Sequence, residues 1–180
     1  MGVEVVLLGD DGGLEVLTDA NGVATGTTVI ASSNDANGGD DTIEVGPGVN
    51  IVIGGAGTDT ITVLGSTPAS RATILGDSGS MTMSNSGTLL SIESSTPVSG
   101  ARDVITLSSG VNTVIGGAGK DEISAGAGTN TILGDDGKAT FFDNGDLKLI
   151  ESTNLGSGDV DTITLSDGTN TVIAGAGNDI

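Results

Sequence analysis

Aspartate residues recur along this 180-residue chain at a spacing that would bring their carboxylates together. Three pairs are each 18 residues apart, namely Asp41 and Asp59, Asp103 and Asp121, and Asp161 and Asp179. Carboxylates bind hard cations or move protons, and both kinds of chemistry are open to such a pattern. The chain has no His and no Cys, which excludes Ser-His-Asp and Cys-His nucleophile pairs and the common zinc and iron–sulfur sites.

Cation binding is favoured if every 18 residues form one coil of a stack. An Asp at every 18th residue would then lie at the same edge of successive coils, about one strand spacing from the next Asp. Two such charges 5 Å apart repel by about 3 kcal/mol at an effective dielectric of 20. A divalent ion between coils converts this repulsion into a bridge. Calcium accepts oxygens in flexible geometry, whereas magnesium requires a strict octahedron and fits less well.

Short strands between glycine-rich turns are the elements that would position these carboxylates. A β-branched residue follows two positions after nearly every Asp of the pattern, as Ile105 follows Asp103, and a glycine-rich turn precedes it. The 32 glycines, two Phe and absence of Trp and Tyr indicate a thin core of small aliphatic side chains. We therefore predict an all-β fold, a parallel β-solenoid (β-roll) of stacked 18-residue coils.

A longer repeat of 58 residues contains these coils. Residues 76–107 align without gaps on residues 134–165, and a looser copy begins at Gly9-Asp10. We place super-repeats at approximately 1–72, 73–130 and 131–180, the last incomplete, and interpret the chain as a single repeat array from a longer protein. The remaining segment of each copy, residues 138–152 in the last one, is predicted to form a wider third coil, with a protruding hairpin as the alternative.

Three glycine-rich segments carry a nonapeptide motif. Residues 54–62 and 116–124 match the pattern GGxGxDxUx, in which U is a large aliphatic residue, and residues 174–179 repeat it with Ala174 in the first position. In these segments the chain resembles the RTX (repeats-in-toxin) family, whose repeats form a calcium-binding parallel β-roll. The resemblance covers over half of the chain.

The resemblance implies a set of calcium ligands, in which turn carbonyls and the motif aspartates of two adjacent coils share each ion. The bridging pairs would be Asp41 with Asp59, Asp103 with Asp121, and Asp161 with Asp179. The turn glycines of these sites would be Gly55, Gly57, Gly117, Gly119, Gly175 and Gly177. The alternative is that the aspartates only form Asx turns.

The sequence departs from the family pattern in three respects. The opposite edge carries Asn50, Asn112, Asn130 and Asn170, which we expect to form stacked amides with no ion or a weakly bound one. The turns at 37–40, 99–102 and 156–159 are degenerate, and Ala101 with Arg102 predicts a weak middle site. The turns Gly9-Asp10, Gly76-Asp77 and Gly134-Asp135 add a further carboxylate, so that Asp77 and Asp135 are either ligands of a second ion or plain turn residues.

Two apolar residues in succession follow the asparagine turns, as in Val52-Ile53, Val114-Ile115 and Val172-Ile173. Because strand side chains alternate between faces, Ile53, Ile115 and Ile173 are predicted to form an exposed column for lateral self-association, unless a bend buries both residues. The formal net charge of -19 would repel nucleic acid and anionic membranes, and no apolar run is long enough for membrane insertion.

These observations predict a structural role. We expect a calcium-binding repeat segment of a secreted or cell-surface protein, adhesin-like or filament-like, in which calcium is the folding and rigidifying ligand. The alternative is an accessory RTX module of a secreted enzyme or toxin whose catalytic domain lies outside this chain. The five Lys and Arg are scattered singly and suggest no substrate groove, so we expect no enzyme here. The resemblance also implies bacterial type I secretion.

Overall fold

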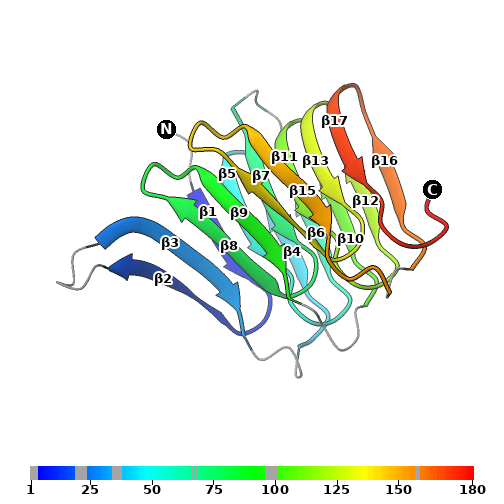
Figure 1. Ribbon diagram of the computed structural model, residues 1–180. Helices are drawn as coiled ribbons and strands as arrows, with labels where there is room; N and C mark the ends of the chain where they lie inside the picture. Colours follow the sequence, from blue (N-terminus) through cyan, green and yellow to red (C-terminus); the bar gives the residue numbers. More distant parts are fainter. Residues whose placement is uncertain are drawn as a thin grey trace.

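The computed structural model describes residues 4–18, 24–33, 38–65, 67, 69–95, 101–156 and 159–180. Within these residues the chain forms seventeen strands and no helix, and therefore no helix that could cross a bilayer. The strands make three sheets, which lie face to face and run along the whole stack. In Figure 1 the colour passes from blue to red along the stack, so each part of the chain lies beside the part that precedes it.

Two of the three sheets are parallel and form the roll. The central sheet contains β1 (Glu4–Leu8), β5 (Val49–Ile53), β7 (Arg71–Leu75), β11 (Gly110–Ile115), β13 (Gly128–Leu133) and β17 (Gly168–Ile173), in that order. The outer sheet contains β4 (Thr42–Val45), β6 (Thr60–Val63), β10 (Val104–Leu107), β12 (Glu122–Ala125) and β16 (Thr162–Leu165). Each coil, called a rung below, contributes one strand to each of these two sheets, except that the rung of β1 has no outer-sheet strand among the described residues.

The predicted 18-residue register is present in the rungs. In β10 and β12, Ile105 pairs with Ile123, and in β11 and β13, Asn112 pairs with Asn130. Parallel pairing in register stacks identical side chains on top of one another, which explains why the same residue types return at the same position of each rung.

The extra segment of each copy is not a wider third coil, so that prediction was wrong. It forms an antiparallel hairpin: β2 (Gly12–Thr18) with β3 (Ala24–Ser32), β8 (Gly79–Ser84) with β9 (Leu89–Ser94), and β14 (Gly137–Phe141) with β15 (Leu147–Ser152). Successive hairpins pair with one another through β3 and β8 and through β9 and β14, which gives a third sheet, the hairpin sheet. The alternation of apolar and polar residues in these segments suits strands that cover one face of another sheet.

The core has two layers, one on each face of the central sheet. In the first layer, Val52, Ile74 and Val114 of the central sheet pack with Ile61 and Ile105 of the outer sheet. The alternate side chains of the central strands face the hairpin sheet and form the second layer with it. This layer contains Ile51, Ile53, Leu75, Ile115 and Leu133 of the central sheet, and Met81 and Ile92 of the hairpin sheet. Alternating side chains of one strand thus fill both layers.

The predicted exposed isoleucine column is therefore absent from the described structure. Ile53 and Ile115 are 1% and 0% exposed because the hairpin sheet covers that face, and Ile173 is half-buried against the same core layer. Both residues are buried in the pairs Val52-Ile53 and Val114-Ile115, as the alternative expected, whereas Val172 of the last pair is exposed. An additional sheet and not a bend is the cause of this burial. The proposed lateral contact through these residues has no support.

Candidate metal centre

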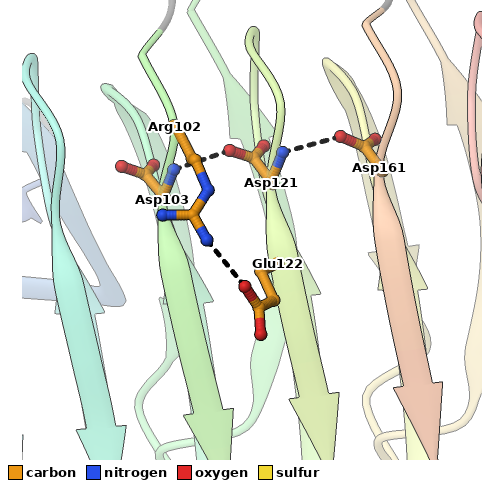
Figure 2. A network of polar contacts seen from close by, with 5 residues as sticks. All are labelled: Arg102, Asp103, Asp121, Glu122 and Asp161. Atoms are coloured by element: carbon orange, nitrogen blue, oxygen red, sulfur yellow. Dashed lines mark hydrogen bonds and ion pairs between the residues drawn. The ribbon is translucent and has the colours of Figure 1, made fainter.

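Six aspartates form a continuous row at one edge of the roll. Each of the first five precedes a strand of the outer sheet, as Asp103 precedes β10 and Asp121 precedes β12. The backbone N–H of each of these five donates a hydrogen bond to the Oδ1 atom of the aspartate one rung later, at distances of 2.8 to 3.0 Å. The row comprises Asp41, Asp59, Asp103, Asp121, Asp161 and Asp179. Figure 2 shows Asp103, Asp121 and Asp161 in line on neighbouring strands.

The three predicted pairs are adjacent in this aspartate row, and the row also joins the pairs to one another. Asp59 donates its N–H to Asp103, 44 residues away, and Asp121 donates to Asp161, 40 residues away. In both links, the segment of the chain between the two aspartates contains a hairpin. The sequence spacing did not reveal them because the inserted hairpin hides the adjacency of the rungs on either side.

Glycine is required in the turns that place these aspartates. Gly117 and Gly119 have φ values of +111° and +125°, a region that side chains with a Cβ rarely adopt. A Cβ at Gly116 would overlap both Gly134 O of the next rung and the Oδ2 atom of Asp121. The turn is therefore closed tightly around the carboxylate.

One oxygen of each enclosed carboxylate has no partner. Among the described residues, the Oδ2 atoms of five members of the row are buried without any hydrogen bond: Asp41, Asp59, Asp103, Asp121 and Asp161. Asp59, Asp103 and Asp161 are 0% exposed and Asp121 is 1% exposed. A buried, unpaired carboxylate oxygen is costly, and a row of them inside glycine turns fits a hard cation that accepts oxygen ligands.

Burial also changes the acidity of the row. Burial, and to a smaller extent the neighbouring aspartates, raise the pKa of Asp59 to about 6, of Asp103 and Asp161 to about 7, and of Asp121 to about 9, although a backbone hydrogen bond to each carboxylate opposes the rise. Without a cation, the fold therefore favours protonation of these carboxyl groups at pH values where an exposed aspartate is ionised, and most strongly at Asp121. A bound cation would remove that need by supplying the opposite charge.

Asp77 and Asp135, the two further candidates, also reach the glycine turns. The Oδ2 atom of Asp77 accepts a hydrogen bond from the N–H of Ala118 at 2.7 Å, and Asp77 is 3% exposed. Asp135 makes the equivalent contact with Ala176. Burial, and then the charge of Asp103, raise the pKa of Asp77 to about 8. Both side chains thus enter the turn of the next rung.

Side chains alone would not hold a metal here. In the part of the chain that the structure describes, no three His, Cys, Asp or Glu side chains gather closely enough to coordinate an ion by themselves. Any ion at this edge would need backbone carbonyl oxygens as well. Arg102 pairs with the exposed Glu122 at 2.7 Å (Figure 2). Of the degenerate turns, residues 37, 99, 100, 157 and 158 lie outside the described residues, so the weak middle site stays a prediction.

The opposite edge forms the expected amide ladder at Asn112, Asn130 and Asn170, but Asn50 lies outside it because Asn50 pairs in register with Ala72. The Nδ2 of Asn112 donates to Oδ1 of Asn130 at 2.8 Å, and the Nδ2 of Asn130 donates to Oδ1 of Asn170 at 2.8 Å. Each Nδ2 also donates to a backbone carbonyl four residues earlier, as Asn130 does to Gly126 at 3.0 Å. These amides satisfy one another without an added ion.

Comparison with known proteins identifies the repeats. The family model of the RTX calcium-binding nonapeptide repeat matches residues 35–63, 106–140 and 155–180, together half of the chain. No curated protein and no solved structure matches the chain. The nonapeptide repeats of this family bind Ca²⁺, occur in secreted bacterial proteins and act as a structural module. The chain belongs to the RTX calcium-binding repeat family, and calcium is the ion that its repeats bind.

Proposed function

We propose that this chain is a structural segment of a secreted or cell-surface protein, adhesin-like or filament-like, in which calcium drives folding and stiffens the roll. The aspartate row would supply the carboxylate ligands, together with Asp77 and Asp135. Carbonyl groups of the glycine turns would complete each site, at the turns that contain Gly55 and Gly57, Gly117 and Gly119, and Gly175 and Gly177. The observation that carries the proposal is the series of buried, unpartnered Oδ2 atoms.

Because the aspartate row is costly to bury without a cation, calcium would act as a switch for folding. Each rung that stacks adds another enclosed carboxylate, and burial raises the pKa of these groups well above 3.8. At low calcium and neutral pH, folding therefore requires either proton uptake or buried negative charge, and both oppose it. Extracellular calcium modules have dissociation constants of about 10⁻⁴–10⁻³ M, so millimolar calcium would add about 1–2 kcal/mol per site.

This balance suits export followed by folding. In a compartment with little calcium the chain would stay loosely folded, and it would fold on reaching millimolar calcium outside the cell. Bacterial type I secretion, which the family resemblance suggests, would fit this order of events. An accessory module of a secreted enzyme or toxin would use the same calcium chemistry, and nothing in the described residues favours that alternative.

The test is a calcium titration followed by far-UV circular dichroism after removal of calcium at pH 7.5. We expect the strand signal to rise with calcium and not with the same concentration of magnesium. A double variant, Asp103→Asn with Asp121→Asn, removes two ligands together with their electrostatic cost, so its strand signal should depend less on calcium than that of the unchanged chain. The matched control, Asp143→Asn with Asp146→Asn, removes the same charge from an exposed hairpin tip and should leave the transition unchanged. A spectrum that does not respond to calcium would refute the proposal.

A further inference from the structure

A cavity of about 320 Å³ lies between the central sheet and the tips of two hairpins. Its floor is formed by the first residues of β5, β7 and β11, and its roof by the loops that join β8 to β9 and β14 to β15. These two tips lie next to each other at the same end of the hairpin sheet (Figure 1), and a Cβ at Gly145 would be 3.8 Å from Cγ2 of Thr88. The aspartate row lies beyond the other end of the central strands, so the cavity is a separate feature.

Two nearly buried threonine side chains face the cavity from its floor. Because Leu75 points toward the hairpin sheet, Thr73, two residues earlier in the strand, points the same way, and Thr113 is its partner in β11. The two threonines are 8% and 6% exposed, and among the described residues neither side chain has a hydrogen-bond partner. The neighbouring strand β5 has Ile51 at this position, so packing does not require a hydroxyl group here. A ligand in the cavity would supply the partners that the protein does not.

Arg71, at the rim of the cavity, differs in charge from its neighbours in the sheet. It is exposed and pairs in register with Val49 on one side and Val111 on the other. In the described part of the chain its guanidinium makes no ion pair, whereas Arg102 and Lys138 each pair with a glutamate. No Asp or Glu lines the cavity, although the chain has 24 of them. The cavity therefore offers a metal ion no carboxylate ligand and offers an anion an unpaired guanidinium.

The roof adds hydroxyl groups beside an apolar wall. Ser86 and Thr88 line the cavity, and Ser86 Oγ lies 2.8 Å from Ser84 Oγ and 3.1 Å from Thr88 Oγ1. Each hydroxyl group can donate one hydrogen bond and accept two, so this chain of hydroxyls keeps capacity for a ligand. Leu89 and Phe141 supply apolar surface. Polar groups on two sides and an apolar wall are the usual composition of a site for a small molecule.

The size and chemistry of the cavity define a class of ligand. Its volume of about 320 Å³ is at the lower end of the range for small-molecule sites, about 300–1,000 Å³, which suits one sugar ring. Thr73 and Thr113 stand on neighbouring strands, about 4.8 Å apart, close to the spacing of alternate equatorial hydroxyl groups on a pyranose ring. Arg71 is the single cation of the lining, and one carboxylate would balance it with two parallel hydrogen bonds.

We propose that this cavity binds a sugar residue that carries a carboxylate, a hexuronate. Arg71 pairs with the carboxylate, Thr73 and Thr113 bond ring hydroxyl groups, and Phe141 covers an apolar face of the ring. This inference goes beyond the proposed function, because calcium would hold the rungs together whereas the cavity gives the roll an organic ligand of its own.

The experiment follows the backbone amide signals of the isotope-labelled full chain by NMR in millimolar calcium while D-glucuronate is added. We expect shifts at the residues that line the cavity, and a much weaker response to D-glucose, which has the same ring without the carboxylate. Methyl β-D-glucuronide, added in parallel, distinguishes the two sources of such a ligand. Equal binding of both acids assigns a terminal residue of a glycan, and binding of glucuronate alone assigns the free sugar.

Variants test the assigned contacts. Arg71→Gln should weaken glucuronate binding at least about tenfold because a charge-assisted pair is lost, and Thr113→Val about threefold or more because one hydroxyl group is lost. Two matched controls should leave the affinity unchanged. Arg102→Gln changes an exposed arginine away from the cavity, and Thr131→Val changes a threonine that is 6% exposed in the same column but does not line the cavity.

Three results would overturn the inference. Equal affinity for glucose and glucuronate, or unchanged glucuronate affinity in Arg71→Gln, would show that the guanidinium does not select the ligand. Absence of shifts at the cavity residues with tens of millimolar glucuronate would show that the cavity is not a site for this sugar. None of these results bears on calcium binding, which the calcium titration tests separately. Because Arg71 is exposed, Arg71→Gln keeps the test decisive if Thr113→Val does not fold.

Discussion

Replacing Asp121 by asparagine should have opposite effects on the calcium-free protein and on its response to calcium. Asp121 is 1% exposed, and burial together with Asp103, Asp161 and Asp77 raises its pKa from 3.8 to about 9. Asparagine keeps the oxygen that accepts the Asp103 N–H at 2.9 Å, but it carries no charge. The substitution therefore removes an electrostatic cost and a cation ligand at the same time.

The size of the first effect follows from the acidity of the side chain. Keeping a carboxyl group of pKa 3.8 protonated at pH 7.5 costs about 5 kcal/mol, at 1.36 kcal/mol per pH unit. This is an upper limit to the gain in unfolding free energy without calcium, because burial of the amide has its own cost; we expect a gain of about 2 kcal/mol or more. With millimolar calcium the variant should lose the contribution of at least one site, about 1–2 kcal/mol.

Urea unfolding of both chains, with and without 5 mM calcium, measures the two effects separately. We expect the midpoint of Asp121→Asn to be higher than that of the unchanged chain without calcium. The increase in midpoint on adding calcium should be smaller in the variant. A lower midpoint without calcium, or an undiminished calcium-dependent increase, would refute the reasoning about this carboxylate.

Three further predictions address the pH dependence, the turns and the opposite edge. Because burial raises the pKa values of Asp59, Asp103, Asp121 and Asp161 to about 6 to 9, the calcium-free fold binds more protons than the unfolded chain, so its urea midpoint should fall from pH 5 to pH 8; a rising midpoint would contradict this. Gly116→Ala should lower the unfolding free energy by about 2 kcal/mol or more through its overlap with Gly134 O, whereas Gly13→Ala, whose Cβ meets no atom within 4 Å, should change it by less than about 0.5 kcal/mol. Asn130→Ala removes a partner of the buried Asn112 amide and should cost about 1–3 kcal/mol equally with and without calcium; a calcium-dependent cost would place an ion at that edge.

The aspartate row could be predicted because its geometry follows from a period. Once 18 residues make one rung, Asp103 must lie beside Asp121 and Asn112 beside Asn130, and the hydrogen bonds confirm both. The closeness of Asp59 to Asp103 could not be inferred in this way. That contact depends on the hairpin leaving the roll and returning to the same rung, which the spacing of 44 residues conceals.

The hairpin sheet was missed although the sequence contains a signal for it. Consecutive apolar residues such as Val114-Ile115 indicate a strand that is buried on both faces, as strands between two layers are. The outer sheet could cover only the face to which Val114 points, so a second covering layer was needed for Ile115. Met81 and Ile92 of β8 and β9 provide that layer. Alternation within these strands fitted either a coil or a hairpin, and only the pairing between strands distinguishes the two.

A crystal structure of the chain grown in calcium, with anomalous scattering to locate the ions, tests the central claim most directly. The account predicts calcium ions in line along the turn edge, with the Oδ2 atoms of Asp103 and Asp121 at calcium–oxygen distances of about 2.3–2.6 Å and none at the asparagine edge. Ions found elsewhere, with the Oδ2 atoms of the aspartate row still unpartnered, would contradict it.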